Sequence, residues 1–267
     1  MTGATGGIGV EILRGLLAVG VDVVIGCRDP GRAAATIAGL PAAHRAHVVV
    51  RPLDLAALAS VRELVRWVSG ELPRLDVLVN NAAVWSRQRR ATTDGLDLTF
   101  GVNHVAHHAL SVGLLPVLRR SPAARVITVA SGIHVRGRLA WDDLMQVTGG
   151  YNGVRAYEQS KLANVMFALA LARRAGKGVT SNAVHPGIAR TNLTKDYPEM
   201  FRQAKPGSIV SAAVAARAPL RLALDPALAG ITGRYFDRDR EQAPSKAALS
   251  HADQERLWQV TDALISA

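Results

Sequence analysis

The chain has 267 residues, of which 49% are hydrophobic and 4% aromatic, and it carries 32 Lys and Arg against 21 Asp and Glu. This length fits one large α/β domain or two small ones, and the apolar content excludes a disordered chain. The formal net charge of +11 is compatible with nucleic-acid binding, but the arginines are scattered and no nucleic-acid motif is present. We therefore predict no nucleic-acid partner.

The cysteine count and the hydropathy pattern bear on location. The single cysteine, Cys27, excludes an internal disulfide and fits a reducing compartment. No signal-peptide pattern opens the sequence, and no apolar run approaches the roughly 20 residues that a membrane helix needs. We expect a cytoplasmic protein without membrane contact.

Short β-branched runs alternate with longer amphipathic segments along the chain, which predicts a doubly wound parallel sheet with helices on both faces. The predicted order is helix 9–19, strand 21–26, helix 31–39, strand 47–51, helix 55–69, strand 75–80, helix 96–119, strand 125–130, helix 154–175, strand 179–184, helix 207–224, strand 233–236 and helix 251–265. No repeat or linker is present, so we predict one α/β domain over residues 1–267. Residues 190–206 are the one long irregular stretch and are predicted to be a substrate-side loop.

A glycine-rich segment, TGATGGIG at residues 2–9, directly precedes the first predicted helix. Glycines let the backbone turn tightly and approach a pyrophosphate, which then rests on the positive end of the helix. The next strand follows at the spacing of a dinucleotide-binding Rossmann fold. We predict that the loop binds a dinucleotide cofactor through Gly3, Thr5, Gly7, Ile8 and Gly9.

The residues after the strand at 21–26 indicate which dinucleotide is bound. An acid at this strand end selects NAD by binding the adenosine ribose, whereas an arginine pairs with the 2′-phosphate of NADP. Cys27 stands where the acid would be and Arg28 follows it. This pattern favours NADP(H) over NAD(H), with Arg28 as the phosphate contact; the alternative is an ordinary surface arginine.

A Rossmann loop normally follows a strand, but only Met1 and Thr2 precede Gly3. The preceding strand would lie in the middle of the sheet, between the strands at 21–26 and 75–80. Its absence would leave both neighbours with unpaired backbone groups. We therefore expect a sheet without its first strand, and we hypothesise a truncated or mis-assigned start, which the upstream genomic frame would test.

Tyr157 and Lys161 are four residues apart on the helix predicted at 154–175, so both side chains share one helix face. A nearby ammonium favours phenolate over phenol and lowers a tyrosine pKa from its usual value of about 10. A tyrosine with such a pKa can exchange a proton with an alcohol or carbonyl oxygen near neutral pH. The pair is common on exposed helices, so it gains meaning only from other motifs.

Ordered motifs over nearly the whole chain provide that context, and together they resemble the short-chain dehydrogenase/reductase family, specifically its retinol-dehydrogenase-like branch. The family motifs are TGATGGIG at 2–9, LDL at 53–55, NNAA at 80–83, VNH at 102–104, VASG at 129–132, the Tyr157/Lys161 pair and HPG at 185–187. The branch motifs are WDDL at 141–144, QSKLAN at 159–164, GRYF at 233–236, PS at 244–245 and LW at 257–258.

The resemblance implies four catalytic residues. Tyr157 would be the general acid in carbonyl reduction and the general base in alcohol oxidation. Ser131 would hydrogen-bond the substrate oxygen. Lys161 would hold the nicotinamide ribose as well as lower the pKa of Tyr157. Asn103 would position a water that links Lys161 to solvent.

The resemblance also implies further cofactor contacts and an activity. The added contacts are Asp54, Leu55, Asn81, Ala82, Pro186, Ile188 and Thr191, beside Tyr157 and Lys161 themselves. The implied activity is hydride transfer between NADP(H) and a small-molecule carbonyl or alcohol. Two alternatives stay open: an NAD-dependent alcohol dehydrogenase of the same family, or a non-catalytic dinucleotide-binding protein. Relatives commonly pair through their long helices, so a homo-oligomer is also open.

Several residues depart from the family pattern or invite another reading. Ala83 replaces the usual glycine of the NNAG motif, and Gly6 stands where many NADP-preferring members have a basic residue, so Arg28 would act with Arg32. His104 and His108 have the helical spacing of metal ligands, but no third ligand is evident and the reaction needs no metal. We predict no metal site.

Overall fold

The computed structural model describes residues 1–191, 193–195, 197, 201, 204 and 207–266. The first half of the chain forms α1 (Ile8–Leu17), β1 (Val23–Cys27), α2 (Pro30–Ala38), α3 (Ala42–Arg45), β2 (Val48–Pro52), α4 (Leu58–Glu71), β3 (Val77–Asn80), α5 (Leu98–Phe100), the π-helical segment η1 (Gly101–Val105) and α6 (Ala106–Leu118). The second half forms β4 (Ala124–Val129), the short 3-10 helix η2 (Gly132–Arg136), α7 (Gly153–Arg174), β5 (Val179–His185), β6 (Ile188–Ala189), β7 (Ile209–Val210), α9 (Ala212–Leu224), the 3-10 helix η3 (Pro226–Leu228), β8 (Tyr235–Asp237), β9 (Arg240–Gln242), α10 (Lys246–Leu249) and α11 (His251–Ser266).

The strands form a mostly parallel sheet in two hydrogen-bonded parts. One part is β1–β2, and the other has the order β3–β4–β5–β8–β9, in which only the β8–β9 pair is antiparallel. Met1 and Thr2 lie between the two parts: the Gly26 N–H donates to the Met1 carbonyl, and the Thr2 N–H donates to the Val79 carbonyl, each at 3.0 Å. These two residues occupy the position expected for the first strand, and their contacts join β1 to β3.

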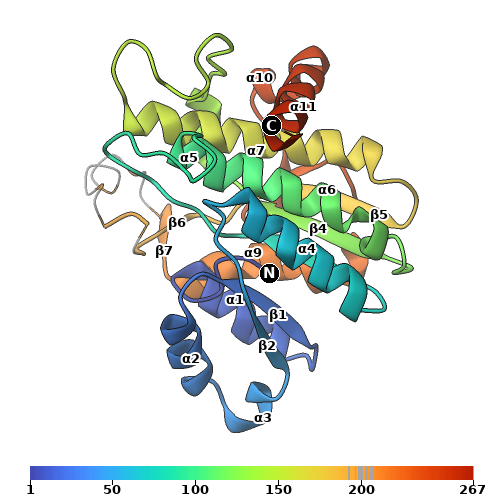
Figure 1. Cartoon of the computed structure of the whole chain (residues 1–267). Helices are drawn as coiled ribbons and strands as arrows, with labels where there is room; N and C mark the ends of the chain where they lie inside the picture. The colour runs from blue at the N-terminus through green and yellow to red at the C-terminus, as the bar shows by residue number, and fades with distance from the viewer. Residues whose placement is uncertain (192, 196, 198–200, 202–203, 205–206, 267) are drawn as a thin grey trace.

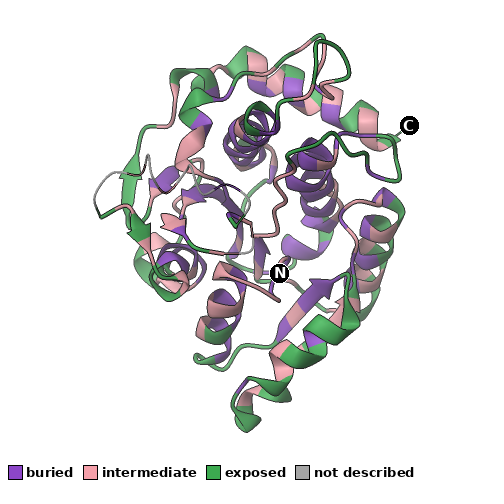
Figure 2. Cartoon of the chain, turned by 90° about the vertical axis from the view of Figure 1, so that its left-hand side faces the viewer, coloured by how far each residue is buried: buried purple, intermediate pink, exposed green. Residues whose placement is uncertain are grey.

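Helices cover both faces of the sheet (Figure 1). On one face, α1 and α9 pack together over a core that includes Ile12, Ile25 and Leu222. On the other face, α4, α6 and α7 lie side by side, and their apolar side chains fill two further clusters against β3, β4 and β5. Figure 2 shows the same division, with buried residues in the interior and exposed residues around the rim. The fold is therefore the expected doubly wound α/β architecture.

The predicted elements are found within a few residues, with three instructive differences. The predicted helix at 207–224 begins only at Ala212, because residues Ile209–Val210 pair with Ile188–Ala189 and Ser211 caps the helix by accepting a hydrogen bond from the Val214 N–H. The predicted helix at 96–119 contains the π-helical segment η1. Three short strands, β6, β7 and β9, were not predicted, because two- or three-residue strands carry no periodic signal.

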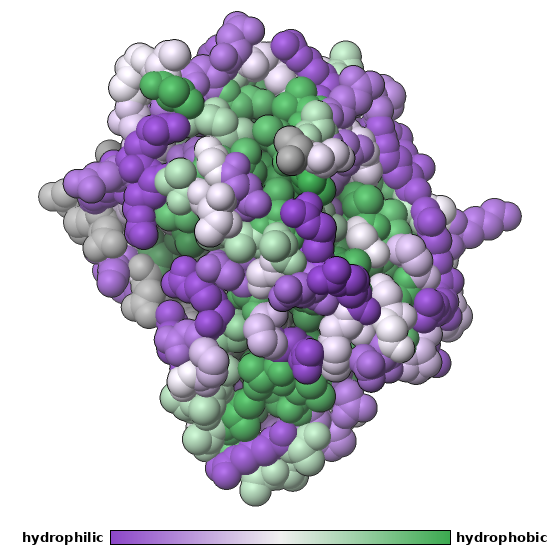
Figure 3. Space-filling model, in the orientation of Figure 1, coloured by the Kyte–Doolittle hydropathy of each residue, from purple (hydrophilic) through white to green (hydrophobic). Residues whose placement is uncertain are grey.

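Charged and polar side chains cover much of the face in Figure 3, while apolar surface gathers over the lower part of the molecule. None of the helices in the described part of the chain has the length and apolar character that crossing a lipid bilayer requires. Of the predicted substrate-side loop at 190–206, residues 192, 196, 198–200, 202–203 and 205–206 lie outside the described residues.

Candidate active site

The glycine-rich loop closes tightly on the start of α1. Gly3 has φ +67°, and a Cβ on it would lie 2.7 Å from the Ala82 Cα. A Cβ on Gly9 would lie 1.8 Å from the Gly3 carbonyl oxygen. Gly7 is the N-cap of α1 and has no side chain to cap the helix. The Gly9 N–H donates to the Gly6 carbonyl at 3.1 Å, and the other N–H groups of the first turn have no side-chain cap. Ile8 is the first residue of the helix. This arrangement is that of an anion-binding helix N-terminus.

Thr2 and Asn81 connect this loop to the end of β3. The Thr2 hydroxyl accepts hydrogen bonds from the N–H groups of Asn81 and Ala82, each at 3.0 Å. The Asn81 side chain donates to the carbonyls of Thr2 at 3.2 Å and Gly3 at 3.0 Å. Asn81 and Ala82 therefore form the wall of the loop, next to the predicted cofactor side.

The end of β1 lies beside the same loop. The Arg32 guanidinium donates to the Thr5 carbonyl at 3.3 Å, so this side chain lies across the loop. Arg28 is exposed directly after Cys27. Asp29 caps α2 by accepting from the Arg32 N–H, which commits the nearest carboxylate to the helix. Two guanidinium-bearing residues thus stand at the strand end, beside an Asp29 carboxylate of which one oxygen is bonded to α2.

The remaining predicted cofactor residues fall at two places. Asp54 and Leu55 follow β2, where the Asp54 carboxylate accepts from the Ala56 N–H at 2.9 Å and Leu55 is buried. Pro186, Ile188 and Thr191 follow β5, and a Cβ on Gly7 would lie 2.7 Å from the Thr191 Cγ2. The structure thus brings Thr191 against the glycine loop, whereas Asp54 lies on the β2 side.

Asn103 is fully buried in the π-helical segment η1, a rare conformation that is frequent at functional sites. Its side chain accepts from the Val84 N–H at 2.8 Å and donates to the Val84 carbonyl at 2.9 Å and to the Ser160 hydroxyl at 3.0 Å. The Asn103 carbonyl contacts His107 Nδ1 at 3.1 Å. Asn103 therefore joins η1, the chain after β3 and α7.

Ser131 stands at the carboxyl end of β4 and is the N-cap of η2. Its carbonyl contacts His134 Nδ1 at 2.9 Å, while His134 Nε2 accepts from the Ser245 N–H at 3.1 Å. Because Nε2 is an acceptor, the proton of the neutral ring must be on Nδ1, which donates to Ser131. His134 thus fixes the backbone of Ser131 from behind. The link from His134 to Ser245 had no sequence signal.

Tyr157 and Lys161 share one face of α7, as predicted, and both are buried. The Lys161 Nζ lies 5.5 Å from the centre of the Tyr157 ring and donates to the Val129 carbonyl at 3.1 Å. Val129 precedes Ser131 by two residues on β4. The ammonium therefore ties the helix that carries Tyr157 to the strand that presents Ser131.

The expected lowering of the Tyr157 pKa by Lys161 is not found, and that expectation is wrong for this structure. Burial raises the pKa of Tyr157 above its ordinary value, since a phenolate loses more hydration than a phenol. Burial also lowers the pKa of Lys161 to about 7, so the charge that was to act on Tyr157 is itself disfavoured. Desolvation outweighs the interaction between the two groups.

Sequence reasoning missed Trp85, Tyr197 and Gly153. The Trp85 ring stacks on Tyr157 with ring centres 4.3 Å apart and an interplanar angle of 8°, and on Tyr197 at 3.6 Å and 15°. The Trp85 Nε1–H donates to the Gly153 carbonyl at 2.9 Å. Tyr197 lies within the predicted substrate-side loop at 190–206.

The histidines near Asn103 attach α11 to the body of the molecule. His104 Nε2 contacts the Thr261 hydroxyl at 3.0 Å, and His108 Nε2 pairs with the Asp262 carboxylate at 2.8 Å. Within residues 1–191, 207–266 and the few described between them, no group of three or more His, Cys, Asp or Glu side chains is arranged to hold a metal ion. The spacing of His104 and His108 therefore serves helix packing.

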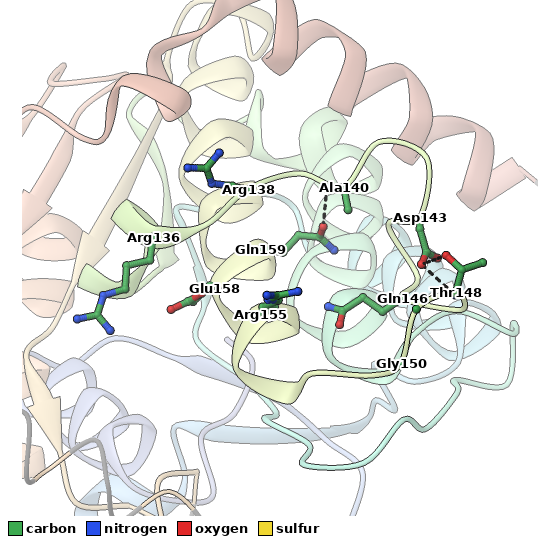
Figure 4. Close-up of a pocket in the computed structure, with 11 residues that line it drawn as sticks. Arg136, Arg138, Ala140, Asp143, Gln146, Thr148, Gly150, Arg155, Glu158 and Gln159 are labelled. Carbon is green, nitrogen blue, oxygen red and sulfur yellow. Dashed lines mark hydrogen bonds between the residues drawn. The ribbon is translucent and has the colours of Figure 1, made fainter.

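A cavity of about 490 Å³ lies between α7 and the segment before it (Figure 4). It is lined mainly by Arg136, Arg138, Arg155, Glu158 and Gln159. At 100° per residue, Arg155 and Gln159 lie on the side of α7 opposite Tyr157. Gln159 bridges the two walls, accepting from the Ala140 N–H and donating to the Leu144 carbonyl. This cavity is separate from the candidate active site.

Comparison with known proteins identifies the class of enzyme that this site belongs to. The family model for short chain dehydrogenases matches residues 1–202. The chain is a short-chain dehydrogenase/reductase, an oxidoreductase acting on CH–OH or C=O groups of small molecules, and such enzymes bind a nicotinamide dinucleotide.

Its relatives place it in the retinol-dehydrogenase-like branch of that family. It is 40% identical to human retinol dehydrogenase 13 over 97% of this chain and 81% of that protein. Among solved structures, an uncharacterized protein from Mycobacterium Paratuberculosis superposes with a TM-score of 0.81 at 31% identity, covering 100% of this chain and 92% of that one. A short chain dehydrogenase from Burkholderia cenocepacia in complex with NADP superposes with a TM-score of 0.70 at 27% identity, covering 89% and 94%.

Proposed function

We propose that this protein is an NADP(H)-dependent oxidoreductase that transfers hydride between the nicotinamide and a carbonyl or alcohol substrate, with Tyr157 as general acid and base. The observation that carries the proposal is the placement of Lys161, whose Nζ lies over the Tyr157 ring and donates to the Val129 carbonyl. This contact brings the proposed proton donor to the strand end that presents Ser131.

The glycine loop fits the dinucleotide. Gly3 and Gly9 leave no room for side chains where the backbone turns, and the uncapped N-terminus of α1 offers N–H groups and a positive dipole to a pyrophosphate. Gly3, Thr5, Gly7, Ile8 and Gly9 would hold this part of the cofactor. Other contacts would come from Asp54, Leu55, Asn81, Ala82, Pro186, Ile188, Thr191 and the two residues Tyr157 and Lys161. When bound, the nicotinamide supplies or accepts the hydride.

The chain itself supplies the proton and the charge stabilisation. Burial keeps Tyr157 protonated at neutral pH, so its hydroxyl is suited to donate a proton to a carbonyl oxygen. Ser131 would donate a hydrogen bond to the same oxygen as negative charge develops on it. Lys161, with a pKa of about 7, can return a proton to Tyr157 at neutral pH. Asn103 would link Lys161 to solvent through a water.

The preference for NADP rests on the end of β1. Arg28 is exposed there, Arg32 lies across the loop, and the carboxylate of Asp29 is occupied by α2. A 2′-phosphate would find two guanidinium groups there. Single-domain organisation over residues 1–267, residues 190–206 as a substrate-side loop, a cytoplasmic location and homo-oligomer formation remain predictions.

Two variants test the proposal. Tyr157→Phe should abolish turnover of carbonyl and alcohol panels while NADPH binding, measured by calorimetry, stays within about threefold. Turnover retained in this variant would rule out the mechanism, and NADPH binding without turnover in the wild type would favour the non-catalytic alternative. Arg28→Ala should reduce the ratio of NADP to NAD affinity by about tenfold or more. An unchanged ratio, or a wild type that prefers NAD, would assign the NAD-dependent alternative.

A further inference from the structure

Four side chains from three separate segments stack face to face over the candidate active site. Tyr157 belongs to α7, Trp85 and Arg87 to the chain after β3, and Tyr197 to the chain after β6. The ring centres of Tyr157 and Tyr197 lie 4.3 Å and 3.6 Å from that of Trp85, and all three rings are nearly parallel. The Arg87 guanidinium lies 4.5 Å from the centre of the Tyr197 ring.

The two tyrosines must lie on opposite faces of the indole. Two aromatic rings that both stack within 4.3 Å of the Trp85 ring centre could not share one face without overlapping each other. One face of Trp85 is therefore committed to Tyr157, and the other is covered by Tyr197. Because Tyr157 is only 6% exposed and Tyr197 only 2%, this stack screens the Tyr157 ring from water.

The indole is also fixed within its own plane. Its Nε1–H donates to the carbonyl of Gly153, the first residue of α7, at 2.9 Å. A Cβ on Gly153 would lie 2.1 Å from the Ser86 carbonyl oxygen and 2.9 Å from the Tyr197 hydroxyl. The chain at Trp85 and Ser86 thus packs directly on the start of α7, four residues before Tyr157, and a glycine is required for that approach.

The backbone next to Trp85 is also fixed by hydrogen bonds. Both backbone polar groups of its neighbour Val84 are bonded to the buried side chain of Asn103. The indole therefore has a fixed backbone, a fixed in-plane hydrogen bond and a ring on each face. A side chain that only filled space would need none of the directional contacts.

We propose that Trp85 is a positioning residue for Tyr157: its indole sets the ring plane of the proton-donating tyrosine and keeps water from it, and Tyr197 holds the indole in place from the substrate-side loop. The inference rests on the proposed function, in which Tyr157 transfers the proton. Proton transfer requires the phenol oxygen within hydrogen-bond reach of the substrate oxygen, so a ring free to tilt would lose rate without losing cofactor affinity.

The test compares graded variants of the stack in the full chain. Trp85→Phe keeps a ring on Tyr157 but loses the Nε1–H bond, and Trp85→Leu loses both. Tyr197→Phe keeps the outer ring, and Tyr197→Leu removes it. Trp67→Phe is the matched control, since Trp67 lies on α4 against Arg51, away from the stack. Steady-state kinetics and [13Cζ]tyrosine NMR titrations, with the Tyr157 signal assigned from Tyr157→Phe, are measured for each.

We expect kcat to fall about tenfold or more in Trp85→Leu and about threefold in Trp85→Phe, with the KM for NADPH unchanged within about twofold. Tyr197→Leu should show a smaller fall than Trp85→Leu, and Tyr197→Phe and Trp67→Phe none. Water admitted to the Tyr157 ring should lower its pKa, so the 13Cζ titration moves to lower pH in Trp85→Leu. Lys161 is the charged group that faces this ring, and it is retained throughout.

The NMR titration separates positioning from bulk packing and does not depend on turnover. If folded Trp85→Leu titrates at Tyr157 like the wild type, or if its activity loss only follows its unfolded fraction, the inference is overturned. If Trp85→Leu does not fold, Trp85→Phe decides: an unchanged kcat and an unchanged titration overturn the inference. Turnover that survives in Tyr157→Phe would instead refute the proposed function.

Discussion

The Asn103 side chain is bonded to both backbone polar groups of Val84: it accepts from the Val84 N–H at 2.8 Å and donates to the Val84 carbonyl at 2.9 Å. Its second amide hydrogen is donated to the Ser160 hydroxyl, which in turn donates to the Tyr157 carbonyl at 2.8 Å. A single buried amide thus orders the segment that carries Trp85 and one turn of α7. These contacts give Asn103 a structural role in addition to the water-binding role proposed for it.

This contact predicts a large stability loss on substitution. Asn103→Ala should lower the free energy of unfolding by about 2–4 kcal/mol, because two backbone groups of the half-buried Val84 lose their partners and a buried amide side chain is removed. Asn103→Asp should be no better, since a carboxylate cannot donate to the Val84 carbonyl. Urea unfolding measures both. A loss below about 1 kcal/mol in either variant would contradict this account of the Asn103–Val84 contact.

Lys161 predicts an unusual dependence of stability on pH. Burial lowers its pKa in the folded protein from 10.5 to about 7, so between these values the unfolded chain binds more protons and folded stability rises with pH. Lys161→Met should therefore be more stable than the wild type at pH 6, on the order of 3 kcal/mol, with the advantage shrinking toward pH 10. Urea unfolding at pH 6, 8 and 9.5 measures the difference, with the exposed Lys177→Met as the control for charge removal. An advantage that is equal at all three pH values would contradict the assignment.

Gly9 and Gly6 form a matched pair in the cofactor loop. A Cβ at Gly9 would overlap the Gly3 carbonyl at 1.8 Å, whereas one at Gly6 would meet only the flexible end of Arg32 at 3.2 Å. Gly9→Ala should weaken NADPH binding by more than about tenfold and lower the Tm, while Gly6→Ala should bind within about threefold of wild type. Calorimetric titration and thermal unfolding of both variants check this. Equal effects of the two substitutions would contradict the loop geometry.

His134 should act through its Nδ1–H bond to the Ser131 carbonyl. Asn at this position can still donate a hydrogen bond there, whereas Leu cannot. We expect kcat to fall about threefold in His134→Asn and about tenfold or more in His134→Leu, with little change in NADPH binding. Burial lowers the pKa of His134, so the neutral ring required for both contacts persists at neutral pH. An identical kcat in the two variants would show that the donor is irrelevant.

The architecture and the positions of the candidate site residues on their strands and helices were predictable because both have periodic or spaced signals. Each of these signals can be recognised from residues that are close together in the sequence. They are the alternation of strands and helices, the glycine loop and the Tyr157/Lys161 spacing. The place of the missing first strand between β1 and β3 also follows from that order, but the hydrogen bonds of Met1 and Thr2 to Gly26 and Val79 were not predicted. The family assignment is confirmed, and the roles of the individual site residues stay proposals.

The remaining features depend on contacts between distant segments, which local rules do not contain. Trp85 meets Tyr157 across 72 residues and Tyr197 across 112, as the difference of their sequence numbers gives. Neither residue has a motif of its own. The predicted direction of the Tyr157 pKa shift was also wrong. The sequence spacing indicates that a charge is nearby, but it does not indicate how deeply Tyr157 and Lys161 are buried.

The attachment of α11 through histidines sets how the protein should respond to acid. His104, His107 and His108 are buried, and burial lowers the pKa of each, to about 4 for His107. The folded protein therefore excludes protons that the unfolded chain takes up near pH 6.5, so stability falls as pH drops below that value. His104 and His108 hold Thr261 and Asp262 of α11, whereas His107 Nε2 contacts the Thr2 hydroxyl at 2.9 Å. Protonation of these rings would therefore act both where α11 attaches and, through His107 and Thr2, in the middle of the sheet, so imidazoles would set the acid limit of this enzyme.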